Sequence, residues 1–364
     1  MLVKYNNSIL NLANSIREYY GLDTYYDTDK DVSEWLNTNK FKHLFLILID
    51  GMGSRILDEK LDRHSFLIKN RIKEVATVYP TTTTAATTSI LTGKSPKENA
   101  YLGWSQYFKE ADDQIILFRE QGLYSKKDYQ GFINEVLPCK KIFDDLDEKG
   151  ISNDSIWPIW GHNGVDGIEE LVDKIFDFSK KDISFCYAYY DALDTLEHLE
   201  GVKSDKVTML IKQIDQQLSR LSKLDDDCGV IVVADHGQID CVNVDLEDYP
   251  DIMECLKVLP SIEPRCMAFS IKDGMHERFE KAFRKHFNET FALLSKEEAI
   301  HMNLFGLNDA HERFEEFILD YLAIGTSNVC LYVGKSKMKG QHSGTKEKEF
   351  MVPIITIPKF VRKN

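Results

Sequence analysis

Residues 44–53 read Leu-Phe-Leu-Ile-Leu-Ile-Asp-Gly-Met-Gly. Six consecutive apolar residues without polar alternation are typical of a strand buried on both faces, as in a parallel sheet with helices on either side. The strand ends in Asp50, which is followed by glycines. In open α/β sheets, ligands bind beyond the carboxyl ends of such strands. The run therefore predicts an α/β fold with Asp50 at a candidate site.

Two further apolar runs end in acids and histidines. Residues 183–190 precede a segment that contains Asp194 and His198, and residues 229–234 precede Asp235-His236-Gly237. Helical patterns separate these runs, at residues 141–149, 167–178 and 204–224. Strands that alternate with helices favour parallel pairing. We therefore expect a three-layer α/β/α sandwich with a mostly parallel central sheet.

A threonine-rich turn lies between the first two runs. Residues 79–93 read Tyr-Pro-Thr-Thr-Thr-Thr-Ala-Ala-Thr-Thr-Ser-Ile-Leu-Thr-Gly. Pro80 would end an incoming strand, and residues 85–91 can form a short helix that stops near Gly93. A hydroxyl at the start of that helix would meet free N–H groups that attract anions. The turn predicts either a phosphate site with a nucleophile or a helix cap with solvated hydroxyls.

The residues at these predicted strand ends form one chemically consistent set. Zinc accepts carboxylate and imidazole ligands, usually four per ion, so two ions could share the set. Asp194 and His198 are four residues apart and would face one way on a helical turn. Taken singly, each member has an ordinary alternative, such as an Asp-Gly turn, a helix-surface pair or a loop histidine. The candidate ligands are Asp50, Thr83, Asp194, His198, Asp235, His236 and His342.

This ordered set resembles the alkaline phosphatase superfamily, and within it the nucleotide pyrophosphatase/phosphodiesterase branch, over roughly residues 44–357. The resemblance implies two bound Zn²⁺ ions, although such sites can also take Mn²⁺ or Fe²⁺. It implies that Thr83 is the nucleophile, with Thr82 and Thr84 as alternatives. The implied ligands of one zinc are Asp50, Thr83, Asp235 and His236, and those of the other are Asp194, His198 and His342.

The resemblance also implies a phosphoric ester hydrolase, most simply a phosphodiesterase or nucleotide pyrophosphatase for a small phosphorylated substrate such as a nucleotide. Eukaryotic phosphodiesterases carry Phe-Pro-Asn where this chain has Thr84-Ala85-Ala86. A phosphomonoesterase or phosphonate hydrolase on the same site therefore remains an alternative. A non-catalytic, metal-stabilised protein that binds a phosphorylated ligand is a third.

Several residues outside the ligand set are candidates for substrate contacts. Trp104 and Tyr101 could stack on a base, and Tyr190 or Asp191 could act beside the second metal motif. Arg265 could reach a phosphate. For each of them, a purely structural role in an aromatic core or on the surface is the alternative.

The pattern changes after residue 245. Residues 246–324 alternate short strands and helices and are interpreted as a small α+β cap insertion. Residues 1–245 and 325–364 would then form the catalytic, alkaline phosphatase-like domain. Residues 94–138 have no clean period and are interpreted as excursions above the sheet. Residues 22–39 are polar and irregular.

Composition excludes some classes of partner. The 364 residues carry a net charge of −14, which argues against binding to nucleic-acid polymers or anionic membranes. The seven cysteines include no C-x-x-C pair and suggest reduced thiols in a cytoplasmic protein. We expect no signal peptide in the first 14 residues and no membrane span. The oligomeric state stays open.

Overall fold

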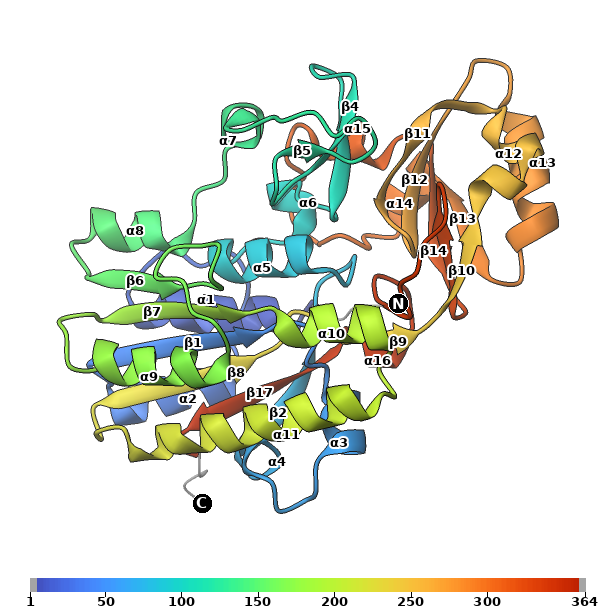
Figure 1. The fold of residues 1–364 in the computed structure, drawn as a ribbon. Coiled ribbons are helices and arrows are strands. Elements are labelled where there is room, and N and C mark those ends of the chain that lie inside the picture. Colours follow the sequence, from blue (N-terminus) through green and yellow to red (C-terminus); the bar gives the residue numbers. More distant parts are fainter. Residues whose placement is uncertain (1–4, 360–364) are drawn as a thin grey trace.

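A six-stranded sheet forms the centre of the computed structural model, which describes residues 5–359 (Figure 1). Pairing is parallel from β8 through β1 and β7 to β6, while β17 runs antiparallel to both of its neighbours. The predicted mostly parallel sheet is confirmed. In spatial order the strands are β2 (Arg71–Ala76), β17 (Met351–Ile357), β8 (Cys228–Val233), β1 (His43–Ile49), β7 (Phe185–Tyr190) and β6 (Asn153–Ile156).

Helices cover both faces of this sheet, as expected for a three-layer sandwich (Figure 1). One group of mutually contacting helices is α1 (Ile9–Tyr19), α2 (Lys30–Asn39), α5 (Thr83–Thr92) and α8 (Ile142–Glu148). The other group is α3 (Ser54–Lys60), α4 (Phe66–Asn70), α9 (Ile168–Phe178), α10 (Ala192–Glu200) and α11 (Asp205–Ser219). Every residue of β1 and β8 is buried between these layers, in agreement with their continuous apolar sequence.

The register of the central strands brings the predicted site residues to one edge. Ile49 pairs with Tyr190, and Leu48 pairs with Val233. Because these three strands are parallel, Asp50, Asp191 and Asp235 all leave the sheet on the same side. Gly51 follows Asp50 with φ of 76°, a conformation that glycine adopts without strain. The turn after β1 therefore places the buried Asp50 beside the chain that follows β8.

A second sheet stands beside the first and is entirely antiparallel (Figure 1). Three of its strands come from the region interpreted as irregular excursions, so this sheet draws on more of the chain than residues 246–324 alone. We call the two segments that form it, residues 105–122 and 256–325, the cap. Its strands are, in order, β13 (Phe291–Ser295), β14 (Tyr321–Gly325), β12 (Cys266–Ile271), β11 (Leu256–Glu263), β3 (Ser105–Phe108), β4 (Asp113–Ile116) and β5 (Gln121–Gly122).

The cap has its own apolar core. Helix α13 (His276–Phe287) buries Phe279, Phe283 and Phe287 against Phe269 and Phe291 of the sheet. The predicted boundary of the cap at residues 246–324 remains a prediction, and residues 1–4 and 360–364 of the predicted catalytic domain lie outside the described residues.

The remaining elements are short. They are α6 (Pro96–Asn99), α7 (Phe132–Val136), α12 (Pro250–Met253), α14 (Lys296–His301), α15 (Phe314–Ile318), α16 (Glu347–Phe350), the 3₁₀ turns Arg220–Lys223 and Leu246–Asp248, and the paired strands β9 (Ile239–Asp240) with β16 (Gly340–Gln341) and β10 (Val242–Asp245) with β15 (Val329–Tyr332). Within residues 5–359, no helix has both the length and the apolar character that a membrane crossing would require.

Candidate active site and metal centre

The predicted nucleophile lies against residues from two strand ends. Thr83 begins α5, and its Oγ1 is 3.1 Å from Nε2 of His236. The same hydroxyl is 3.4 and 3.3 Å from the two carboxylate oxygens of Asp50. Asp235 Oδ1 accepts hydrogen bonds from the backbone N–H groups of Gly51 and His236. The structure thus brings Asp50, Thr83, Asp235 and His236 together.

The neighbouring threonines point elsewhere. Thr82 Oγ1 donates to Glu263, and Thr84 Oγ1 is buried with no hydrogen-bond partner among residues 5–359. The backbone N–H groups of Thr83, Thr84 and Ala85 are unpaired within the described residues, as expected for the first turn of a helix. Of the three threonines considered from the sequence, only Thr83 places its hydroxyl beside Asp50 and His236.

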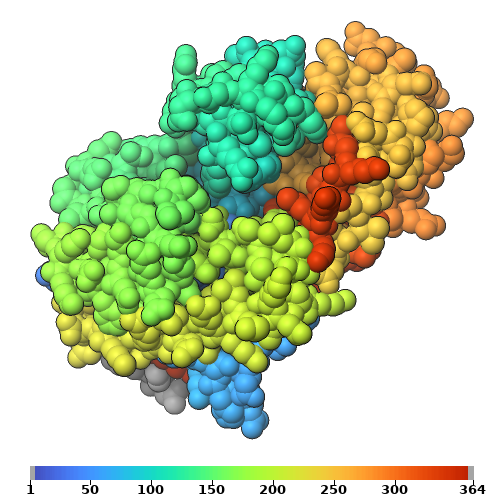
Figure 2. Space-filling model, viewed as in Figure 1, coloured from blue at the N-terminus to red at the C-terminus, as the bar shows by residue number. Residues whose placement is uncertain are grey.

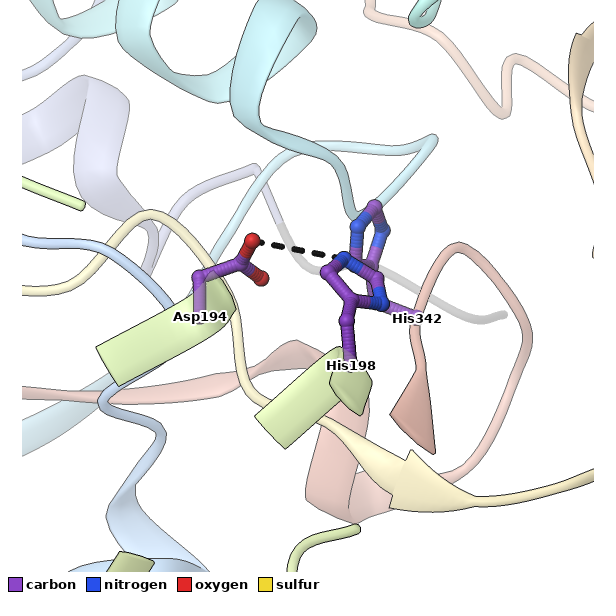
Figure 3. Close-up of side chains that lie close together, drawn as sticks. All are labelled: Asp194, His198 and His342. Carbon is purple, nitrogen blue, oxygen red and sulfur yellow. Dashed lines mark ion pairs between the residues drawn. The ribbon is translucent and has the colours of Figure 1, made fainter. Parts of the chain in front are cut away.

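A second group of ligand-type residues comes from α10 and from the loop after β16 (Figure 3). One oxygen or nitrogen atom from each of Asp194, His198 and His342 lies within 4.8 Å of the others. His198 Nε2 is 3.3 Å from Asp194 Oδ2, which is the helical i, i+4 pair that the spacing predicted. His342 lies more than 140 residues after this pair in the sequence, and the fold brings it next to them.

The two groups of ligand-type residues lie directly beside each other. Ligand-type atoms of Asp50, Asp194 and His236 also lie within 4.8 Å of one another, so Asp194 stands between the two sets. The imidazole rings of His236 and His342 have centroids 4.0 Å apart. All seven residues predicted as ligands therefore surround one small volume.

Three carboxylates lie close together here: Asp50 and Asp235 are buried, and Asp194 is partly buried. Burial, followed by the charges of Asp235 and Asp194, raises the pKa of Asp50 well above its usual value. Burial likewise raises the pKa of Asp235, although His236 opposes the shift. Buried like charges need cations or protons to compensate them. The site is therefore built to receive positive charge.

Asp194 and His198 already form one such compensated pair. Burial is the largest single influence and opposes ionisation of both groups. The attraction to His198, together with His236 and His342, nevertheless lowers the pKa of Asp194, and Asp194 with the Gly340 carbonyl raises the pKa of His198 to about 9. His342 also lies near Asp194, but burial together with the charge of His236 lowers its pKa well below the usual range. A neutral imidazole is the form that binds a metal.

The histidines are held with one ring nitrogen directed toward the site. Carbonyl oxygens lie 2.9 Å from Nδ1 of His198 and 3.3 Å from Nδ1 of His236. His342 Nδ1 pairs with the Ser343 hydroxyl at 2.8 Å. A carbonyl can only accept, so Nδ1 of the first two donates, and the neutral ring keeps a lone pair on Nε2. Oxygen partners of this kind orient histidine ligands in metal sites.

Comparison with known proteins decides the family. A family model described as type I phosphodiesterase/nucleotide pyrophosphatase matches residues 44–344, which include all seven predicted ligands. The chain belongs to this family. Its members hydrolyse phosphoester and pyrophosphate bonds, so the chain is a hydrolase of the alkaline phosphatase superfamily. No curated protein matches the sequence.

Solved structures of this superfamily share the fold. Murine ectonucleotide pyrophosphatase/phosphodiesterase 5 is 17% identical, with a TM-score of 0.68 and coverage of 86% of this chain and 87% of that chain. The human counterpart is 15% identical with the same TM-score and coverage. Phosphonoacetate hydrolase from Sinorhizobium meliloti 1021, in complex with phosphonoformate, is 14% identical, with a TM-score of 0.65 over 86% of this chain and 89% of that chain.

Three further residues of this site were not assigned a role from the sequence. Tyr189 donates its hydroxyl to Asp50, and Gln238 donates its amide to the Asp194 carboxylate. Thr81 Oγ1 accepts a bond of 3.0 Å from Ser343 N, which ties the loop of His342 to the nucleophile turn. Tyr189 lies in an entirely apolar and aromatic strand, so nothing in the local pattern distinguishes its hydroxyl.

The residues considered as candidates for substrate contacts differ in their burial and in their partners. Tyr101 is buried and donates to the Leu137 carbonyl, so it serves the core. Trp104 is partly exposed, and the Arg119 guanidinium lies 5.4 Å from its ring centroid. Asp191 accepts a hydrogen bond from the exposed Trp160. Tyr190 is almost fully buried.

The proposal that Arg265 reaches a phosphate is wrong. Its side chain is fully buried and makes two hydrogen bonds to Glu349, at 2.8 and 2.9 Å. It also donates to the carbonyls of Val329 and Ser327. Arg265 therefore joins the turn between β11 and β12 to α16. A lone arginine in the sequence cannot reveal such partners, because they lie 62 to 84 residues away.

The buried ion pair between Arg265 and Glu349 gives a first test of the fold. Arg265→Met is expected to lower the free energy of unfolding by about 3–5 kcal/mol, because it leaves the Glu349 charge buried and unpaired. Urea denaturation followed by circular dichroism measures the change. Arg278→Met removes an exposed ion pair with Glu254 and is expected to cost about 1 kcal/mol or less. Equal losses in both variants would contradict the structural role of Arg265.

Proposed function

We propose that this chain is a metal-dependent phosphodiesterase or nucleotide pyrophosphatase in which Thr83 is the nucleophile. The observation that carries the proposal is the position of the Thr83 hydroxyl. It lies within 3.4 Å of Asp50 and His236, at the N-terminal end of α5, where three backbone N–H groups are unpaired within the described residues. An anion is favoured at such a helix end.

The residues present fit two divalent cations. Within the described residues Asp235 Oδ2 is buried without a hydrogen-bond partner, with His236 Nε2 3.5 Å away, and such a group is costly unless a cation compensates it. One ion would be held by Asp50, Thr83, Asp235 and His236, and the other by Asp194, His198 and His342, with zinc as the proposed metal because of the mixed oxygen and nitrogen donors. Bound there, the pair would lower the pKa of the attacking hydroxyl and neutralise charge on the phosphoryl group.

The chain's own groups then define the reaction. Thr83 Oγ1 forms a bond to phosphorus while the bond from phosphorus to the leaving oxygen breaks, and the Thr83 proton has Asp50 within reach. The free N–H groups of α5 would donate to the phosphoryl oxygens. Water then cleaves the threonine ester and restores the hydroxyl. Tyr189 and Gln238 orient Asp50 and Asp194 throughout.

Two kinds of similar structure support a small phosphorylated substrate. An inactive threonine-to-alanine variant of the murine enzyme is in complex with AMP, and the Sinorhizobium enzyme is in complex with phosphonoformate. A nucleotide is the first substrate that we propose, and a phosphonate is the second. A cytoplasmic location stays a prediction.

The preference between diesters and monoesters tests this proposal. The zinc-loaded protein is expected to hydrolyse the p-nitrophenyl ester of thymidine monophosphate with a kcat/KM about 100-fold above that for p-nitrophenyl phosphate, a difference of about 2.7 kcal/mol. Steady-state kinetics on both substrates measure the ratio. A ratio in favour of the monoester would establish a phosphatase. Turnover of phosphonoacetate alone would favour the phosphonate hydrolase.

A further inference from the structure

A carboxylate from the cap reaches the nucleophile turn. Glu263 ends β11, and only 4% of its surface is exposed. Its Oε1 accepts hydrogen bonds from the Thr82 hydroxyl and, at 2.7 Å, from the backbone N–H of Trp104. Its Oε2 receives no hydrogen bond from the described residues. Thr82 caps the N-terminus of α5 but does not use its side chain to do so, because that hydroxyl is given to Glu263.

Glu263 also lies within electrostatic reach of the second ligand group. Its negative charge helps to raise the pKa of His198, and Asp194 in turn helps to raise the pKa of Glu263. Burial raises the pKa of Glu263 to about 7, while the bonds from Thr82 and Trp104 oppose the shift. The carboxylate therefore touches the start of the helix proposed to hold the phosphoryl group, and its charge also acts on the second ligand group. Figure 2 shows a hollow where the cap, α10 and the segment near residue 340 meet.

The backbone that aims this carboxylate is strained. Ile262 has φ of 75°, a conformation that β-branched residues avoid. Its neighbour Gly103 allows the close packing, because a Cβ there would lie 2.6 Å from Ile262 Cγ2. Such outliers persist where the surrounding structure fixes them, and they cluster at functional sites. An anchoring role alone would not require a buried carboxylate on a strained strand end.

We infer that Glu263 is a specificity residue that excludes a second negative charge from the bound phosphoryl group, and so selects singly charged diesters over doubly charged monoesters. This inference rests on the proposed function. Its physical basis is repulsion between Oε2 and an extra charged phosphoryl oxygen in a largely desolvated site, where like charges interact strongly. A diester replaces that oxygen with an uncharged ester group and escapes the repulsion.

Glu263→Gln is the informative substitution. The amide oxygen can still accept from Thr82 and Trp104, while the negative charge is lost. The ratio of kcat/KM for p-nitrophenyl phosphate to that for the thymidine diester is expected to rise at least tenfold, chiefly through a lower KM for the monoester. Glu254→Gln removes a charge from an exposed ion pair next to β11 and should leave the ratio unchanged. A change below twofold in Glu263→Gln would overturn the inference.

A binding measurement separates this inference from the proposed reaction. In zinc-loaded Thr83→Ala protein, inorganic phosphate at pH 8 is expected to bind at least tenfold more tightly when Glu263→Gln is added, as measured by calorimetry. Equal affinity with and without Glu263→Gln would refute charge exclusion even if the enzyme is a diesterase. Conversely, a wild-type protein that hydrolyses neither ester would refute the proposed reaction, whatever the change in phosphate affinity.

Discussion

Thr83→Ala is expected to lower kcat for phosphodiester hydrolysis by about 10⁴-fold or more, because loss of a nucleophile removes the covalent route entirely. The hydroxyl that disappears is the one 3.1 Å from His236 and 3.3 Å from Asp50. Thr83→Ser keeps an oxygen at this position and should retain far more activity. Steady-state kinetics measure both variants, and mass spectrometry after an acid quench should find a phosphorylated or nucleotidylated peptide in wild type only.

Thr92→Ala is the matched control for this experiment. Thr92 lies at the other end of the same helix, where its hydroxyl donates to the Thr88 carbonyl at 2.8 Å and accepts from the Lys94 backbone N–H at 3.1 Å. Its loss should leave kcat within about twofold of wild type, because removing a hydroxyl that lies away from the active site acts mainly on the stability of the protein. If Thr83→Ala turned over at the wild-type rate, the nucleophile assignment would be lost, and the label on the trapped peptide would show which residue replaces it.

The strand ends could be predicted from the sequence because each one joins two local signals. A continuous apolar run identifies a strand buried on both faces, and the acid that follows marks its carboxyl end. Asp50, Asp191 and Asp235 satisfy this rule, and parallel pairing then brings them to one edge, with Asp194 in the first turn of the helix that follows Asp191. The helix that follows Thr83 was predictable for a similar reason, since Pro80 and Gly93 bound it on either side.

Contacts that join distant segments could not be predicted in this way. The cap sheet pairs Ile262 of β11 with Ser105 of β3, so two segments more than 150 residues apart build one layer. Short strands of mixed polarity such as β3 carry too weak a pattern to be assigned alone. Helix α2 was missed in a polar stretch because only Val32, Trp35 and Leu36 are buried. Glu263 and Tyr189 gained their roles from these tertiary contacts.

Removal of bound metal is expected to abolish hydrolysis and to lower the melting temperature of the protein. The chain gathers the buried Asp50 and Asp235 and the partly buried Asp194 around one volume, and without cations their like charges oppose folding. A ligand present at 100 times its Kd adds about 2.7 kcal/mol to the free energy of unfolding. Dialysis against a chelator, calorimetric melting and elemental analysis measure the effect, and added Zn²⁺ should restore both activity and melting temperature.

The two ligand groups allow the stoichiometry to be tested residue by residue. His198→Gln removes an imidazole from the group of Asp194 and His342 and is expected to reduce the metal content from two ions per chain toward one. His162→Gln alters an exposed histidine whose partner is Asp154, outside both groups, and should leave the content at two. Asp194 lies within 4.8 Å of atoms from both groups. We therefore expect Asp194→Asn to weaken the binding of both metal ions, whereas His198→Gln should weaken the binding of one. A wild-type chain that hydrolyses the diester with no metal detectable by elemental analysis would refute the metal centre, and equal losses in all three variants would refute the division into two groups.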